Sequence, residues 1–332
     1  MERSTIFGEG KRLTLPVIAF ALLFLLTASL TSATSDNFAQ SEAEILVKAV
    51  EYIRVVAYNP KLQLCREAPR VAPNVYWVAS DNLLAFKALE PYDHVLASTI
   101  RSKLTEIAQQ YMLPRSPENL PLSLRYDLLV RDDETLEVPP RGVVTTILRN
   151  DSYLLKYDIA NGTTLVEDWR EYADLRLLVA LSSHNRGDRD NALSNLTAAV
   201  QMWDGIGLHD KAYDDSYGEG QVAGSSHAYA TYKLGLLLYV SAKLGLPLAP
   251  DMQNSVTERI RQMQNQTSGG IFTHILPNGS HGDSDTNTET TAIIILGLSA
   301  YQAIPEFETT FTAIVLAVSL TVLWRSNGNR IG

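Results

Sequence analysis

A succession of amphipathic segments between residues 41 and 303 limits the folds that this chain can adopt. The first opens with Ser41-Glu42-Ala43-Glu44, a helix-start signal, and apolar residues follow at the spacing of one helix face. Similar segments occupy residues 80–90, 95–112, 168–185, 188–203, 226–245, 251–265 and 287–302. Because short connections make successive helices antiparallel neighbours, the sequence predicts a mainly α domain, an array of helical hairpins.

One stretch, residues 121–160, departs from this pattern. The segments rich in β-branched and aromatic residues are 126–130, 143–148 and 153–157. Asn150-Asp151 and Asn161-Gly162 are turn signals beside them. We therefore expect a small antiparallel sheet or hairpin inserted in the helical array, either as a lid over a cleft or as a cover for an apolar edge.

The N-terminal end has the features of an export signal. Basic residues within the first twelve positions precede the apolar run 13–30, and small residues follow it. This order is typical of a secretory signal peptide, here cleaved after Ala33. The run also approaches the length of a membrane-spanning helix, so an uncleaved signal anchor over 1–33 is the alternative. Either interpretation places the rest of the chain outside the cell.

The C-terminal end, residues 304–332, contains Pro305-Glu306-Phe307, the apolar run 311–324 and arginines in a short polar tail. Basic residues after an apolar run are typical of a stop-transfer helix, so this segment predicts a membrane anchor, with a buried C-terminal helix as the alternative. The order resembles the C-terminal sorting signals of archaeal surface proteins that archaeosortases process. The ends together predict a location at the cell membrane, with the domain on its outer face.

Asn-x-Ser/Thr sequons occur throughout the region between these ends. They are Asn150, Asn161, Asn195, Asn265 and Asn278. An exported archaeal or eukaryotic chain can carry glycans at such positions, so the sequons agree with a surface glycoprotein.

Charge and cysteine content exclude several classes of protein. The net charge is −9 and no cluster of Lys and Arg occurs, which argues against a nucleic-acid partner. Cys65 is the single cysteine, so neither an intrachain disulfide nor a multi-cysteine metal site is possible. No catalytic context surrounds Cys65, and we expect it to be a small buried residue.

Two segments carry a family resemblance. Residues 264–272, with Gly269-Gly270 before an aromatic, and the Thr-rich segment 285–292 resemble repeats of α/α-toroid proteins. Paired glycines permit positive φ in the turn, and Asp285 or Thr286 is expected to cap the next helix. Toroids include terpene cyclases, prenyltransferase β subunits and six-hairpin glycosidases.

Sequence motifs indicate which of these toroid families the chain resembles. The Asp-x-Asp-Asp motif of squalene-type cyclases is absent, and Cys65 is not in the context of a prenyltransferase zinc ligand. The segment 76–85, which contains Trp77 and Asp81-Asn82, resembles those that open inner helices in sugar-handling six-hairpin folds. This sequence supplies four predicted hairpins where those folds have six.

In a toroid the inner helices begin around one central funnel, so the resemblance implies a shared cleft. Its candidate lining residues are Trp77, Asp81, Asn82, Asp168, Trp169, Tyr172, Trp203, Asp204, His227, Tyr229 and Tyr232. Glycoside hydrolysis needs two carboxyl groups with separated pKa values. Asp81 with Asp214 or Asp215 is the predicted catalytic pair, and helix caps and core aromatics are the alternative interpretation of these residues.

Oxygen ligands also alternate at Asp283, Asp285, Asn287 and Glu289, the spacing of the first turn of a calcium loop. An EF-hand is excluded because the turn glycine and the final glutamate are missing, and helix capping is the alternative. The histidines show no zinc-hydrolase spacing. Apart from this Ca²⁺ candidate, no cofactor is predicted.

Two main functions remain open from the sequence, beside the more remote one of a maturation or scaffold factor in the cell envelope. One is a membrane-anchored extracellular hydrolase or lyase that acts on carbohydrate through paired carboxylates in a central cleft. The other is a non-catalytic surface module that binds glycan or protein. Toroid folds host unrelated activities, so the fold alone does not decide between them.

Overall fold

The computed structural model describes residues 42–70, 75–77, 80–149, 154–214, 227–282 and 284–303. The predicted signal segment 1–33 and anchor 304–332 lie outside these residues. The chain divides into two units, Met1–Glu44 and Ile45–Gly332, and the fold belongs to the second. Within the described residues, no helix combines the length and apolar character needed to cross a membrane.

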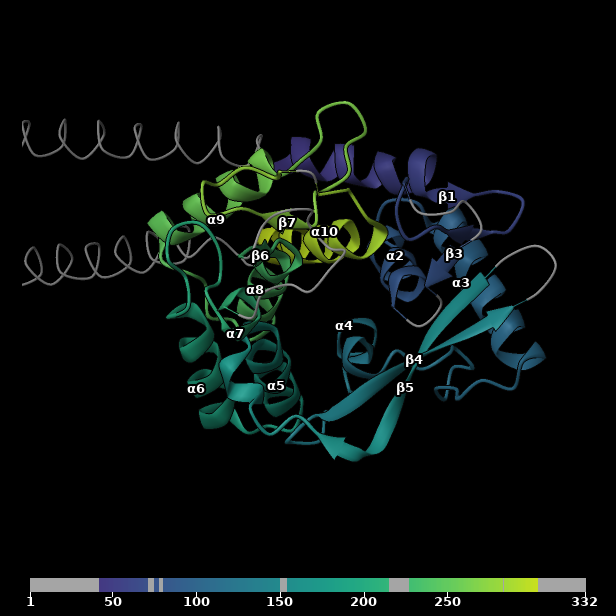
Figure 1. Cartoon of the computed structure of the whole chain (residues 1–332), viewed down its shortest axis with the longest axis horizontal. Helices are drawn as coiled ribbons and strands as arrows, with labels where there is room; N and C mark the ends of the chain where they lie inside the picture. Colours follow the sequence, from purple (N-terminus) through teal and green to yellow (C-terminus); the bar gives the residue numbers. More distant parts are fainter. Residues whose placement is uncertain are drawn as a thin grey trace, which may run out of the picture. The chain divides into compact units, whose positions relative to one another are not determined.

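The fold is mainly helical, as predicted (Figure 1). The longer helices are the one over 42–51, which continues as the π-helical η1 (Tyr52–Ala57), then α2 (Asp81–Leu89), α3 (His94–Gln110), α5 (Ala173–Asn185), α6 (Arg189–Val200), α8 (Tyr232–Lys243), α9 (Pro250–Gln262) and α10 (Thr288–Gln302). Each predicted helical segment therefore contains a helix. Two begin later than expected, because Trp169–Glu171 forms the 3-10 helix η3 before α5 and strand β6 (Tyr229–Ala230) precedes α8.

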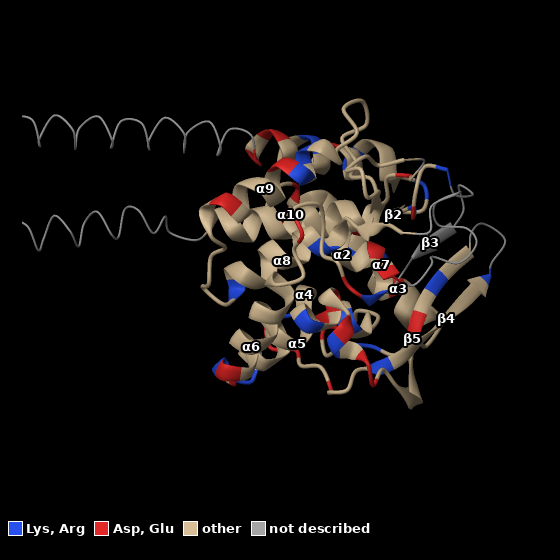
Figure 2. Ribbon diagram, turned by 60° about the vertical axis from the view of Figure 1, so that its left-hand side comes forward, with Lys and Arg blue, Asp and Glu red and all other residues tan. Residues whose placement is uncertain are grey.

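The central helices are α8 and α10. Helix α2 packs against α3 and α10, α10 against α8, α8 against α5, and α5 against α6. Glu289 is the one charged residue of α10, and Figure 2 shows the rest of this helix as uncharged ribbon. The consecutive residues Ile293, Ile294 and Ile295 are all buried. A helix that is apolar on every side belongs in a core, which is where α10 lies.

Glycines bring α8 and α10 into backbone contact. A Cβ atom on Gly297 would lie 2.2 Å from the carbonyl oxygen of Gly235, and a Cβ on Gly235 would lie 2.8 Å from the carbonyl oxygen of Ile293. Side chains larger than hydrogen do not fit at either position without moving the helices apart. The spacing of these two core helices is thus set by a pair of glycines.

The predicted hairpin is present as β4 (Arg141–Arg149) and β5 (Leu154–Leu165), which pair antiparallel. Strand β3 (Val75–Trp77) pairs parallel with β5, which the sequence did not predict, so the sheet order is β3-β5-β4. Asn161-Gly162 does not end β5. The register shifts between Arg141 and Gly142, which indicates a bulge at this point of the strand.

The expected strand over 126–130 is wrong. Leu124–Tyr126 forms the 3-10 helix η2 and Asp127–Val130 the short helix α4. Local hydrogen bonding explains the difference, because the Asp127 carboxylate accepts a bond from the Ser123 backbone N–H at 3.0 Å. Leu128 and Leu129 are both buried in the core. Their apolar run would also suit a strand, but here a helical turn buries it.

The turn before α10 confirms one glycine prediction and corrects a cap. Gly269 has φ +81°, and a Cβ there would lie 2.2 Å from the Lys48 carbonyl oxygen. The cap of α10 is Asn287, whose side chain accepts from the Thr290 N–H at 2.8 Å, so the expected cap at Asp285 or Thr286 is wrong. Asp285 instead accepts from the Arg70 backbone N–H at 3.0 Å.

The remaining described strands form two small sheets of two strands each. Strand β1 (Tyr58–Asn59) pairs with β2 (Leu64–Cys65), and β6 pairs with β7 (His274–Ile275), both antiparallel. A further short helix, α7 (Lys211–Asp214), precedes the undescribed residues 215–226. Cys65 is fully buried, as predicted.

Candidate functional site

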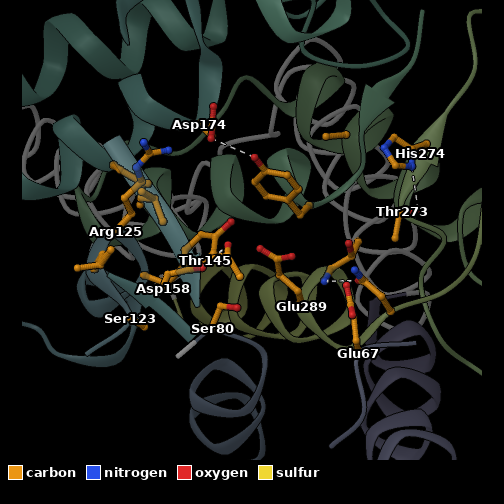
Figure 3. Close-up of a pocket in the computed structure, with 18 residues that line it drawn as sticks. Glu67, Ser80, Ser123, Arg125, Thr145, Asp158, Asp174, Thr273, His274 and Glu289 are labelled. Atoms are coloured by element: carbon orange, nitrogen blue, oxygen red, sulfur yellow. Dashed lines mark hydrogen bonds between the residues drawn. The ribbon is translucent and has the colours of Figure 1, made fainter. Parts of the chain in front are cut away.

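A cavity of about 470 Å³ lies at the N-terminal ends of the helices α2, α5, α8 and α10 (Figure 3). These ends contribute Ser80, Asp174, Tyr232 and Glu289 to its lining. The residues are far apart in the sequence, and each occupies the position just before its helix or in the first turn. The helix packing therefore gathers four separate helix starts around one space.

The hairpin forms another wall of the cavity. Val143 and Thr145 of β4 and Asp158 of β5 line it. Thr145 Oγ1 donates a hydrogen bond to Asp158 Oδ1 at 2.8 Å, which orients this carboxylate from the neighbouring strand. The hairpin thus lines the cavity and does more than cover an apolar edge.

The segment from Ser123 to Tyr126 lines the cavity with unusual backbone and side-chain features. Leu124 has φ +53°, a conformation that is costly for a residue with a branched side chain. Within the described residues, the buried Ser123 Oγ and Arg125 Nε have no hydrogen-bond partner. Buried polar groups are nearly always paired in native proteins, so unpaired groups beside a cavity are what a ligand-binding wall presents.

Acidic side chains dominate the cavity. Glu67, Asp158, Asp174 and Glu289 line it, and Arg125 is the one lysine or arginine that the described lining contains. His274 also lines the cavity, but burial, and secondarily the charge of Lys233, lower its pKa to about 4. This histidine is therefore neutral at neutral pH.

The surroundings of Glu289 favour its protonated form more than water does. Burial raises its pKa above the ordinary value, and the negative charges of Glu67 and Asp158 raise it further. A hydrogen bond from Tyr126 acts in the opposite direction but is outweighed. A carboxyl group whose pKa is raised in this way is suited to the role of a proton donor.

Asp174 has the contrasting environment. Its Oδ2 accepts a hydrogen bond from the Tyr232 hydroxyl at 3.0 Å, and Lys233 Nζ lies 4.0 Å from its Oδ1. These two contacts fix the position of the Asp174 carboxylate in the wall. In the view of Figure 3, Asp174 lies above Glu289.

Asp81, one member of the predicted catalytic pair, lies behind the cavity wall. It is 1% exposed and is not among the lining residues, although its neighbour Ser80 is. Ser80 Oγ donates to Asp81 Oδ1 at 2.9 Å, while Oδ2 has no hydrogen-bond partner among the described residues. Burial, followed by the charges of Glu289 and Glu67, raises its pKa well above the ordinary range.

Asn82 has an internal role. Its Oδ1 accepts from the Cys65 N–H at 2.6 Å, and its Nδ2 donates to the Cys65 carbonyl at 3.0 Å. This predicted substrate-binding residue is fully buried and ties α2 to strand β2.

The second predicted acid, Asp214, belongs to a different group of side chains. His209 Nε2 lies 3.0 Å from Asp214 Oδ1, and the ring of Tyr213 stacks on that of His227. Tyr229 donates to Asp204, and Trp203 lies in the same loop, paired with Leu208 by an isolated β-bridge. None of these residues is among those that line the cavity. Asp215 lies outside the described residues.

Other predicted binding residues have structural contacts. Lys211 Nζ lies 2.5 Å from Asp168 Oδ2 and over the Tyr172 ring, 5.9 Å from its centre. Trp169 is 2% exposed and packs in a small apolar cluster with Leu175 and Val179. Trp77 belongs to β3, and the position of its side chain lies outside the described part of the structure.

The calcium candidates are engaged separately. Asp285 accepts from Arg70, Asn287 caps α10 and Glu289 faces the cavity, whereas Asp283 lies outside the described residues. In the described parts of the chain, no three His, Cys, Asp or Glu side chains are arranged to hold a metal ion.

The site residues that sequence reasoning missed are Glu67, Arg125, Tyr126, Asp158 and Asp174. Asp174 could have been found by the argument applied to Asp81, because both are acids in the first turn of a helix. Comparison with models of protein families, with curated proteins and with solved structures found no match to this chain.

Proposed function

We propose that this protein is a membrane-anchored extracellular hydrolase that acts on glycosidic bonds, with Glu289 as general acid and Asp174 as general base or nucleophile. The observation that carries the proposal is a pair of carboxyl groups in one cavity with opposite environments. Two carboxyl groups in different surroundings within one cavity are the arrangement that glycoside hydrolysis needs.

In the proposed reaction, Glu289 gives its proton to the glycosidic oxygen while the bond from that oxygen to the anomeric carbon breaks. Asp174 either takes a proton from the attacking water or attacks the anomeric carbon itself. In the second case, water then releases the sugar from Asp174 and returns a proton to Glu289. The hydrogen bond from Tyr232 and the nearby Lys233 keep Asp174 oriented in either course.

The helix arrangement supports an α/α-toroid-like architecture as part of this proposal. Inner helices of a toroid start around a common funnel, and the starts of α2, α5, α8 and α10 all contribute to the cavity. Asp81 then serves as a positioning residue, because its side chain is held behind Ser80 and away from the substrate.

A lyase is less well supported than a hydrolase. β-Elimination acts on a uronate, and the site must neutralise the carboxylate of that sugar before a base removes the neighbouring proton. The cavity lining instead presents Glu67, Asp158 and Asp174, which oppose the entry of an anionic sugar.

The alternative is a non-catalytic glycan- or protein-binding module, and the unpaired polar groups of Ser123 and Arg125 favour a binding role on their own. For the location, we propose export through the N-terminal segment and anchoring by residues 304–332. Among the sequons, Asn278 is exposed and suits a glycan, whereas Asn195 is buried and its amide donates to Asn191.

The test is release of reducing ends from a panel of neutral and aminated oligosaccharides by the full chain, in a detergent without a sugar headgroup. Glu289→Gln and Asp174→Asn should each lower kcat about a hundredfold or more, the range that general acid–base groups contribute. Asp133→Asn is the matched control, because Asp133 is exposed and does not line the cavity.

Binding by the same variants separates the two functions. Calorimetry should show that Glu289→Gln still binds the oligosaccharides that wild type cleaves. Binding by wild type without any release would favour the non-catalytic module and refute the hydrolase.

A further inference from the structure

The charges around the cavity are unevenly compensated, and this bears on what it binds. Glu67 is paired with Lys156, whose Nζ lies 3.3 Å from Glu67 Oε2. Asp174 has Lys233 at 4.0 Å. In both cases a lysine that is not among the lining residues lies beside the carboxylate, and Lys233 also pairs with Asp210.

Asp158 differs from these carboxylates. Asp158 accepts a hydrogen bond from Thr145. It forms no ion pair with any Lys, Arg or His of the described residues, unlike Glu67 and Asp174. Arg125, the cation of the described lining, donates to the Arg141 backbone carbonyl at 3.3 Å. Asp158 is thus a carboxylate in a cavity wall whose charge lacks a protein cation among the described residues.

A second observation indicates that a ligand completes this wall. Ser123 is 5% exposed, lines the cavity and leaves its hydroxyl without a partner among the described residues. Arg125 Nε, in the same strained segment, is also unpaired. Both groups can donate to oxygen atoms, so a ligand with hydroxyl groups would satisfy them while a cationic group meets Asp158.

We infer that the substrate is an amino-sugar oligosaccharide whose protonated amine binds Asp158. This rests on the proposed function and names the substrate class of the same site. The amine supplies the cation that Asp158 lacks, and ring hydroxyls accept from Ser123 and Arg125. An N-acetylated sugar has no cation to offer, and a uronate brings the wrong charge to this wall.

The test is calorimetric titration of the full chain with three tetrasaccharides at a pH that protonates the amine: β-1,4-linked glucosamine, its N-acetylated form and a uronate. The glucosamine tetramer should bind about tenfold more tightly than the N-acetylated one, and Asp158→Asn should abolish that preference. Asp133→Asn should keep it, because this control removes the same charge outside the cavity lining. Unchanged melting temperatures would show that the variants fold.

Equal binding of the aminated and acetylated tetramers, tighter binding of the uronate, or no binding of any tetramer would overturn the inference. Release of reducing ends, measured on the same samples, keeps the two proposals apart. A preference for the amine without release leaves the inference standing and refutes the hydrolase. Release from acetylated substrates with no amine preference does the reverse.

Discussion

Replacing Lys233 should destabilise the protein strongly, because its charge is buried among acids. Lys233 Nζ lies 2.5 Å from Asp210 Oδ2, and the two side chains are 4% and 1% exposed. Methionine keeps most of the aliphatic stem but leaves Asp210 and Asp174 without their cation. Removing one partner of a buried pair costs about 3–5 kcal/mol, so Lys233→Met should lower the free energy of unfolding by that amount.

Urea unfolding followed by circular dichroism at neutral pH measures this loss. The control is Lys243→Met on the same helix, since Lys243 pairs with Asp132 at 2.7 Å while the two side chains are 36% and 77% exposed. An exposed pair contributes at most about 1 kcal/mol. Equal losses for the two lysines would refute the reasoning that burial makes the Lys233 pair costly to break.

The double variant with Asp210→Asn adds a second check. Asparagine can still accept the hydrogen bond that Asp210 Oδ2 receives from the Ala173 N–H at 2.7 Å, while the uncompensated charge is gone. We expect Lys233→Met/Asp210→Asn to be more stable than Lys233→Met alone. A double variant that is less stable would mean that Asp210 carries some contact other than the ion pair.

Close glycine contacts and buried acids should give three further measurable effects. Gly297→Ala should cost at least about 2 kcal/mol in thermal unfolding, because its methyl group would strike the Gly235 carbonyl and separate α8 from α10. If Glu289 is the acid, activity should fall as pH rises through its raised pKa, and Tyr126→Phe, which removes a bond that lowers this pKa, should move the alkaline limb to higher pH. Because folding raises the pKa of Asp81, stability should decrease as pH rises above its ordinary value, and Asp81→Asn should flatten this dependence in urea titrations across pH.

Local patterns predicted the helices well. The 3.6-residue spacing of apolar residues located α3 and α9 to within a few residues, because each of these helices has a strongly one-sided apolar face. The segment 126–130 was misassigned since a short apolar run suits a strand or a helical turn equally. The bond from Ser123 to Asp127, together with burial of Leu128 and Leu129, made it helical.

The candidate site was much harder to predict than the helices. The acids of its lining are Glu67, Asp158, Asp174 and Glu289. These residues are far apart in the sequence, and only the packing of their elements brings them together. Asp81 and Asp174 occupy similar first-turn positions, yet one lies behind the wall and the other lines the cavity. That difference depends on helix rotation, which no local pattern of residues specifies.

The two hydrogen bonds between Asn82 and Cys65 give one side chain the role of a missing strand. The amide of Asn82 presents a carbonyl and an N–H to the backbone of β2, as a neighbouring peptide group would. Strand β1 already pairs along the other side of β2, so this amide occupies the edge that would otherwise be open. The first turn of α2 is thereby held at a fixed position on the β1–β2 ribbon. Ser80, which directly precedes α2 and lines the cavity, is held with it. A ribbon outside the cavity thus helps to set the position of a residue that lines the cavity.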